Sequence, residues 1–193
     1  MEIRYVTISK AGRRHNNEDA FRVIDMPENN RFVGIVCDGM GGHSFGETAS
    51  ETVCNTISAF WKKHISMPDC DSKVKLACKK ASCAIDKKTF ELHHAEMGAT
   101  MVMVSIENDV ATIAHIGDSR CYVQRPGDGL LYQTKNISGL ISDGRLLPNA
   151  SSLTAPKWLC QTFDKSSYRL VTECCCVLTD YTKAWLQIFC KQG

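Results

Sequence analysis

The first forty residues show two hydrophobic patterns that are typical of β-strands. Side chains alternate between two faces over residues 3–9, and residues 20–25 form a second candidate strand after a turn. Residues 31–37 are almost continuously apolar from Phe32 onward, which favours a strand buried on both faces. The pattern predicts a compact opening sheet. If the second and third strands pair as sequential neighbours, Glu18 and Asp38 come to the same edge.

Two segments with the period of an amphipathic helix follow. The first begins at Ser44 and ends before Met67, and the second covers residues 71–94. Each carries one apolar stripe, so we expect both helices to pack on the face of a sheet. The lysines of the second helix that we expect to face solvent are Lys79, Lys80, Lys87 and Lys88.

From Thr100 the period returns to that of strands. Short turns separate the candidate strands and predict a meander over residues 100–106, 110–116, 120–125 and 130–133. Beyond residue 136 the pattern has no clear period, apart from an apolar run over 174–180. The residues after that run have room for one helix, predicted at 183–189, and for no further strand.

Composition narrows the class of protein. A chain of 193 residues that is 44% hydrophobic is long enough for one domain with a substantial core, so we expect residues 1–193 to form a single domain. The net charge is +2 and basic residues are dispersed, which excludes the basic patch of a nucleic-acid-binding protein. The sequence contains neither a membrane-length apolar run nor a signal peptide. We therefore expect a cytoplasmic monomer with no membrane and no nucleic-acid partner.

The 11 cysteines raise the alternative of a disulfide-bonded, redox or zinc protein. Their odd number and the absence of any Cys-x-x-Cys pair argue against it. Cys37, Cys78 and Cys121 fall on apolar faces, where a cysteine behaves as a small hydrophobic residue. We expect the cysteines to fill the core.

Acidic residues accompany glycine-containing turns at three places next to strands. Asp38 follows the apolar strand directly and precedes Gly39, and similar turns lie at 12–20 and 117–122. Glycine lets the backbone approach an ion or a phosphate closely. Ser44 and Glu47 then fit a capping box at a helix start. Taken alone, this stretch is equally consistent with an ordinary strand, turn and helix.

Four short motifs, in this order, resemble those of the metal-dependent protein phosphatases, which are the type 2C serine/threonine phosphatases. The resemblance is to the bacterial-type members of this family. The motifs are Arg14 with Glu18 and Asp19, then 38–42 (Asp-Gly-Met-Gly-Gly), 98–100 (Gly-Ala-Thr) and 117–120 (Gly-Asp-Ser-Arg). The resemblance covers residues 1–135 and fades beyond them. It implies an α/β (α+β) fold, a four-layer αββα sandwich of two central, mostly antiparallel sheets flanked by helices, incomplete at a truncated or diverged carboxyl end.

The resemblance also implies roles for individual residues. Asp38 would bridge two Mn²⁺ or Mg²⁺ ions, the Gly39 carbonyl would be a further ligand, and Glu18 would hold a metal-bound water. Asp118 would help to hold a third, looser ion, and Arg14 would bind the substrate phosphate. These residue types suit the chemistry, because hard divalent cations prefer oxygen ligands and a guanidinium binds phosphate through two parallel hydrogen bonds. The alternative for Arg14 is an exposed cation in a short basic cluster.

The sequence departs from the family pattern at two places. Met40 stands where many members have a histidine that donates a proton, a substitution that bacterial-type members share. The family has a further metal ligand, a carboxylate in a Ser-Asp-Gly segment after a late strand. Here the candidates are Asp180, which follows the apolar run, and Asp143, which lies in a Ser-Asp-Gly triplet. The third alternative is that neither residue is this ligand. The family's final Asp-Asn pair has no counterpart in this sequence. We favour Asp180, although Tyr181 replaces the usual glycine.

Two functions follow from these observations. The first is a Mn²⁺- or Mg²⁺-dependent phosphatase, with two or three ions, that hydrolyses phosphoserine and phosphothreonine in proteins modified by serine/threonine kinases. The second is a catalytically impaired, phosphatase-like binding module, which the missing last ligand favours. Which phosphoprotein is involved depends on surface loops that carry no readable signal.

Overall fold

A computed structural model describes most of the first 134 residues and short segments beyond them. The described residues are 2–11, 15–40, 45–69, 71–107, 110–125, 129–134, 141–142, 159–163, 174–178 and 184–191.

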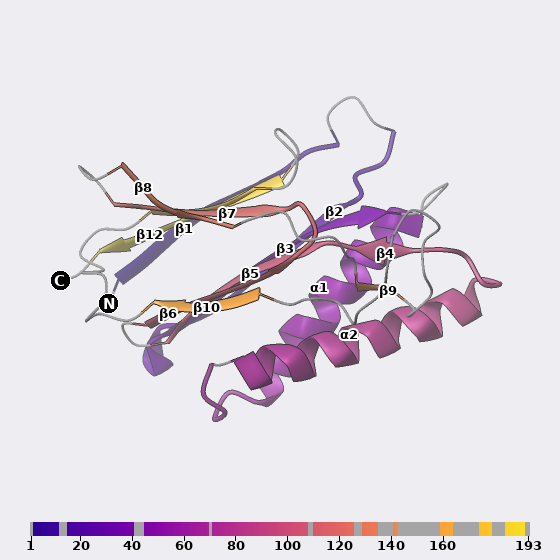
Figure 1. Ribbon diagram of the computed structural model, residues 1–193, viewed down its shortest axis with the longest axis horizontal. Coiled ribbons are helices and arrows are strands. Elements are labelled where there is room, and N and C mark those ends of the chain that lie inside the picture. The colour runs from indigo at the N-terminus through magenta and orange to yellow at the C-terminus, as the bar shows by residue number, and fades with distance from the viewer. Residues whose placement is uncertain are drawn as a thin grey trace.

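The strands form two sheets that lie face to face (Figure 1), and every strand pair is antiparallel. The five-stranded sheet has the order β1 (Glu2–Ser9), β12 (Ala184–Lys191), β11 (Cys174–Leu178), β7 (Arg120–Arg125) and β8 (Gly129–Gln133). The seven-stranded sheet has the order β10 (Leu159–Phe163), β6 (Val110–Ile116), β5 (Met101–Glu107), β3 (Arg31–Met40), β4 (Gly98–Ala99) and β9 (Ile141–Ser142). Its remaining strand, β2 (Asp19–Met26), pairs with β3, and the short 3-10 helix η1 (Pro27–Asn29) joins the two.

Two helices, α1 (Phe45–Lys63) and α2 (Asp71–Glu91), cover the side of the seven-stranded sheet that faces away from the other sheet (Figure 1). One hydrophobic core lies between these helices and the seven-stranded sheet, and it contains Ile35, Ile57 and Ile85. A second core lies between the two sheets and contains Phe32, Val36 and Val104. Among the described residues, no helix combines the length and the apolar composition that crossing a membrane requires.

The two antiparallel sheets and their helical layer confirm the predicted fold class. The described residues comprise three of the four expected layers, with helices on one side of the sandwich. Both predicted helices and the predicted exposure of the four lysines of α2 are confirmed. Cys37, Cys78 and Cys121 are buried, as expected of cysteines that fill a core, whereas Cys83 on α2 is exposed and does not follow that expectation.

The predicted helix at 183–189 is wrong, because residues 184–189 belong to strand β12. All eight residues of β12 pair with β1 on one side, and the strand pairs with β11 on the other. A mostly apolar segment between two strands forms backbone hydrogen bonds in both directions, and this long-range pairing overrides a local helical reading. The chain therefore does have room for a closing strand after residue 180.

The predicted opening sheet and the predicted meander are each divided between the two sheets. Strand β1 lies in the five-stranded sheet, whereas β2 and β3 lie in the other. Strands β5 and β6 pair with each other, but the chain then crosses at Gly117 to β7 in the opposite sheet. Gly117 has a φ of 91°, a left-handed conformation that allows this change of direction.

Two element ends also differ from the prediction. Strand β3 continues past Cys37 to Met40, because β4 pairs with Gly39 and Met40 and extends the sheet. Helix α2 ends at Glu91 instead of continuing to residue 94, since His93 and His94 adopt left-handed φ values of 55° and 65°. The His94 amide donates a hydrogen bond of 2.8 Å to the Thr89 carbonyl, which closes the helix end.

Candidate metal centre

Two carboxylates face each other where β2 begins and β3 approaches its end. Asp19 pairs with Asp38 across the two antiparallel strands. Two residues further into the sheet, Phe21 pairs with Val36, and both contribute to the core between the sheets. Because side chains alternate along a strand, Asp19 and Asp38 point into the same space between the sheets. Directly opposed residues of this kind have Cβ atoms about 5 Å apart.

Glu18 lies beside this pair, against the first turn of α1. Its backbone carbonyl accepts a hydrogen bond of 2.9 Å from the Gly39 amide. Its carboxyl oxygen Oε1 lies 3.0 Å from the position that a Cβ on Gly46 would occupy. Gly39 and Gly46 are themselves in close contact, since a Cβ on Gly39 would lie 1.8 Å from the Gly46 carbonyl oxygen. The two glycines therefore allow the end of β3, the start of α1 and Glu18 to meet.

Thr100, between β4 and β5, holds Asp38 from the other side. Its amide donates to the Asp38 carbonyl at 2.9 Å, and its Oγ1 accepts from the Asp38 amide at 3.0 Å. The same hydroxyl lies 2.6 Å from the Ser119 Oγ. Ser119 follows Asp118, so Thr100 links the two segments that carry Asp38 and Asp118.

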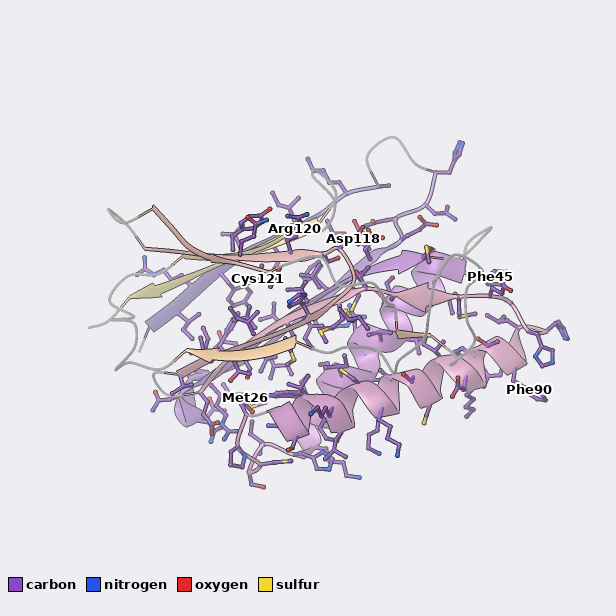
Figure 2. The ribbon with its side chains drawn as sticks, viewed as in Figure 1. Met26, Phe45, Phe90, Asp118, Arg120 and Cys121 are labelled. Atoms are coloured by element: carbon purple, nitrogen blue, oxygen red, sulfur yellow. The ribbon has the colours of Figure 1, made fainter. Side chains whose placement is uncertain are left out.

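Asp118 lies where the chain passes from β6 to β7, at the end of the sandwich opposite to Met26 (Figure 2). Its side chain is exposed, whereas Glu18 and Asp38 are half-buried and Asp19 is 8% exposed. Strand β11 also ends here, with Leu178 opposite Arg120. Several strand ends thus bring acidic residues to one end of the sandwich.

The described residues do not form a complete three-ligand cluster. Within the segments that the structure describes, no group of three or more His, Cys, Asp or Glu side chains is placed to hold a metal ion. Glu18, Asp38 and Asp118 are therefore brought to the same end of the sandwich without converging on one point. Arg14, Asp143 and Asp180 lie outside the described residues.

The donor set nevertheless fits a hard divalent cation. The carboxylates of Asp19 and Asp38 face each other, and like charges in this position are destabilising unless a cation lies near them. All donors here are oxygens, which Mg²⁺ and Mn²⁺ prefer. Asp19 and Thr100 belong to the motifs at 14–19 and 98–100, but the resemblance assigns no role to either residue. Both residues matter because they lie opposite Asp38, Asp19 on strand β2 and Thr100 between β4 and β5. For Asp19, the sequence does contain a signal, which is the Glu-Asp pair at the start of a strand.

A buried histidine, His115, lies three residues before Asp118. It shares the inter-sheet face of β6 with Ile113 and is 1% exposed. Neither ring nitrogen has a hydrogen-bond partner among the described residues. Burial lowers the pKa of His115 below its ordinary value of 6.5, because the charged form loses its hydration.

This shift predicts that stability falls in mild acid. The unfolded chain binds a proton at His115 below about pH 6.5, whereas the folded chain does so only at lower pH. The stability is therefore fully present above about pH 6.5 and declines as the pH falls below it. We expect the urea midpoint to drop between pH 7.5 and 5.5, and His115→Leu to reduce this drop. His15→Ala, a substitution at an exposed histidine, is the control. An equal drop in His115→Leu would exclude His115 as its source.

The family model for protein phosphatase 2C matches residues 9–143 of the chain. The chain belongs to the protein phosphatase 2C family. It is 32% identical over 115 residues to a serine/threonine phosphatase of Listeria monocytogenes, an alignment that covers 57% of this chain and 45% of the relative. It is 33% identical over 153 residues to the serine/threonine protein phosphatase PstP of Mycobacterium tuberculosis, covering 76% of this chain and 28% of that protein. The chain therefore spans less than half the length of these family relatives.

Solved structures of the family share the fold. The crystal structure of the Mycobacterium tuberculosis serine/threonine phosphatase PstP superposes with a TM-score of 0.71 at 17% identity, covering 98% of this chain and 99% of that one. The catalytic domain of PstP in complex with two manganese ions gives a TM-score of 0.67 at 18% identity, covering 97% and 96% of the two chains. A serine/threonine phosphatase from Staphylococcus aureus also gives a TM-score of 0.67, at 18% identity, with coverage of 100% and 95%.

Proposed function

We propose that this chain is a divalent-metal-dependent protein serine/threonine phosphatase. Membership of the protein phosphatase 2C family supports the reaction class. The observation that carries the proposal for this chain is the position of Asp38, which faces Asp19 on one strand and is held by Thr100 on the other side. This arrangement fixes a carboxylate at the end of a rigid strand, beside a backbone carbonyl with no side chain in its way.

In the proposed site, the carboxylates of Glu18, Asp38, Asp118 and Asp180 and the Gly39 carbonyl would hold Mn²⁺ or Mg²⁺ ions. Bound ions of this kind supply positive charge to the phosphoryl oxygens and activate a water as the nucleophile. Arg14 binds two phosphoryl oxygens through its planar guanidinium and so orients the phosphate. Met40 has no proton to donate, so the leaving oxygen takes its proton from water. No side chain forms a covalent bond to the phosphate.

The proposed substrates are phosphoserine and phosphothreonine side chains of proteins modified by serine/threonine kinases. The named functions of the Listeria and Mycobacterium relatives support this substrate class. We further propose that two or three ions are bound, and that the chain acts as a cytoplasmic monomer without a nucleic-acid or membrane partner.

Replacing Asp38 by asparagine tests the proposal. The purified chain should hydrolyse p-nitrophenyl phosphate and a phosphothreonine peptide only when Mn²⁺ is present. Asp38→Asn removes one negative charge from the site, and we expect the rate to fall at least about a hundredfold, since metal-held charge stabilises the transition state by several kcal/mol. Asp25→Asn is the matched control, because Asp25 is an exposed carboxylate at the opposite end of β2, paired with Phe32. Turnover that is independent of Mn²⁺, or equal in Asp38→Asn, would contradict the proposal.

The second candidate is a phosphatase-like module that binds phosphoproteins without hydrolysing them. The lack of a three-ligand cluster among the described residues favours it. Calorimetry with Mn²⁺ and a phosphopeptide separates the two functions. Two tight ion sites together with turnover support the enzyme, whereas weak or single-site ion binding with peptide affinity and no turnover supports the module.

A further inference from the structure

We propose that Thr100 and Ser119 are positioning residues, whose paired hydroxyls set the distance between the two segments that carry Asp38 and Asp118. This inference rests on the proposed metal-dependent function and assigns to it two side chains that need not touch metal or substrate. Both are almost completely buried, Thr100 at 5% and Ser119 at 2% exposure.

Thr100 holds Asp38 by two hydrogen bonds. The Thr100 amide donates to the Asp38 carbonyl at 2.9 Å, and the Asp38 amide donates to Thr100 Oγ1 at 3.0 Å. A main-chain bond and a side-chain bond from one residue fix both the position and the tilt of the Asp38 peptide units. The direction in which the Asp38 carboxylate leaves the strand is thereby set by Thr100.

The Thr100 hydroxyl also reaches the turn that carries Asp118. Its Oγ1 lies 2.6 Å from the Ser119 Oγ, a short distance for a hydroxyl pair. The residue on the other side of Asp118 contacts Thr100 as well, because a Cβ on Gly117 would lie 2.6 Å from Thr100 Cγ2. The Asp118 side chain is exposed and is not packed in the core. The contacts of Gly117 and Ser119 with Thr100 therefore fix the position of Asp118 relative to Asp38. Such outer contacts orient metal ligands, and their loss costs about ten- to hundredfold in metal affinity.

The chain contains a matched control for this arrangement in Thr134. Its Oγ1 accepts a hydrogen bond of 2.9 Å from the Cys121 amide, and its own amide donates to the Cys121 carbonyl at 3.0 Å. Thr134 is 1% exposed, so Thr134→Val removes a hydroxyl in the same kind of two-bond contact. The residue that it holds, Cys121, belongs to the apolar core between the sheets.

The experiment titrates the full chain with Mn²⁺ by calorimetry and measures the hydrolysis of p-nitrophenyl phosphate over a range of Mn²⁺ concentrations. Ser119→Ala breaks the hydroxyl pair and leaves the Thr100–Asp38 bonds in place. We expect it to weaken one class of Mn²⁺ site about tenfold, and to raise the Mn²⁺ concentration for half-maximal rate by a similar factor. The rate at saturating Mn²⁺ should fall less than the affinity does. Thr100→Ser, which keeps the hydroxyl, should retain the affinity that Thr100→Val loses.

Three results would overturn the inference: unchanged Mn²⁺ affinity in Ser119→Ala, an equal loss in Thr134→Val, or an undiminished effect of Ser119→Ala in an Asp118→Asn background. The last result would show that Ser119 does not act through Asp118. If the unsubstituted chain binds no Mn²⁺, the proposed function fails instead. The hydroxyl pair is then tested without metal, through the melting temperatures of Thr100→Val, Ser119→Ala and the double variant. Non-additive shifts support the link between the two segments, and strictly additive shifts overturn it.

Discussion

Gly39→Ala will prevent the chain from reaching a stable folded state. The added Cβ would lie 1.8 Å from the Gly46 carbonyl oxygen and 2.9 Å from the Glu18 carbonyl oxygen. Both obstacles are backbone atoms, so neither can move aside as the tip of a flexible side chain would. Separating β3 from α1 enough to admit a methyl group would disrupt the adjacent core, and we expect a loss of about 4 kcal/mol or more in the free energy of unfolding. Urea denaturation followed by circular dichroism measures this loss.

The neighbouring Met40→Ala is the control for this substitution. Met40 is 49% exposed at the end of the same strand, and we expect its replacement to change the free energy of unfolding by at most about 0.5 kcal/mol. The proposed metal ligand at position 39 is a backbone carbonyl, which alanine retains. A folded Gly39→Ala protein with an unchanged urea midpoint would mean that β3 and α1 are not in the close contact described.

Local patterns were sufficient to predict most elements of the first 134 residues. The bounds of β6 and β7 agree with the predicted 110–116 and 120–125, because turn residues flank both strands. The same reasoning failed for β12. Nothing within residues 183–189 reveals that β1, almost the whole chain away, forms one of its neighbours. Strand pairing between distant segments is not encoded in any short window of sequence.

The candidate site shows the same limit at the level of single residues. The motifs identified Glu18, Asp38 and Asp118, and pairing of β2 with β3 was expected from their adjacency in sequence. Thr100 lies opposite Asp38 and contacts Ser119. Both contacts form only because the ends of three strands and one turn meet at this point. Residue types can nominate ligands, but the packing of buried polar groups around them is a tertiary property.

A buried group of charges lies next to the end of α1 and involves Lys73, a lysine of α2 for which the helical pattern made no prediction. Lys73 is fully buried and its Nζ lies 2.6 Å from the Asp69 Oδ1 and 2.9 Å from the Met67 carbonyl oxygen. The same ammonium lies 4.5 Å from the centre of the Trp61 ring. Asp69, with a side chain 2% exposed, also accepts a hydrogen bond from the Ser105 hydroxyl. These contacts tie the loop between the helices to both α2 and β5.

Asp69→Ala will strongly destabilise the protein, because it leaves the Lys73 ammonium buried without its carboxylate. Removing one partner of a buried ion pair typically costs about 3–5 kcal/mol. The double variant Asp69→Leu with Lys73→Met removes both charges, and we expect it to be more stable than Asp69→Ala, since no lone charge remains in the core. Lys79→Ala, which alters an exposed lysine of the same helix, should leave the urea midpoint unchanged. Equal midpoints for Asp69→Ala and the double variant would show instead that lost packing, and not an uncompensated charge, accounts for the effect.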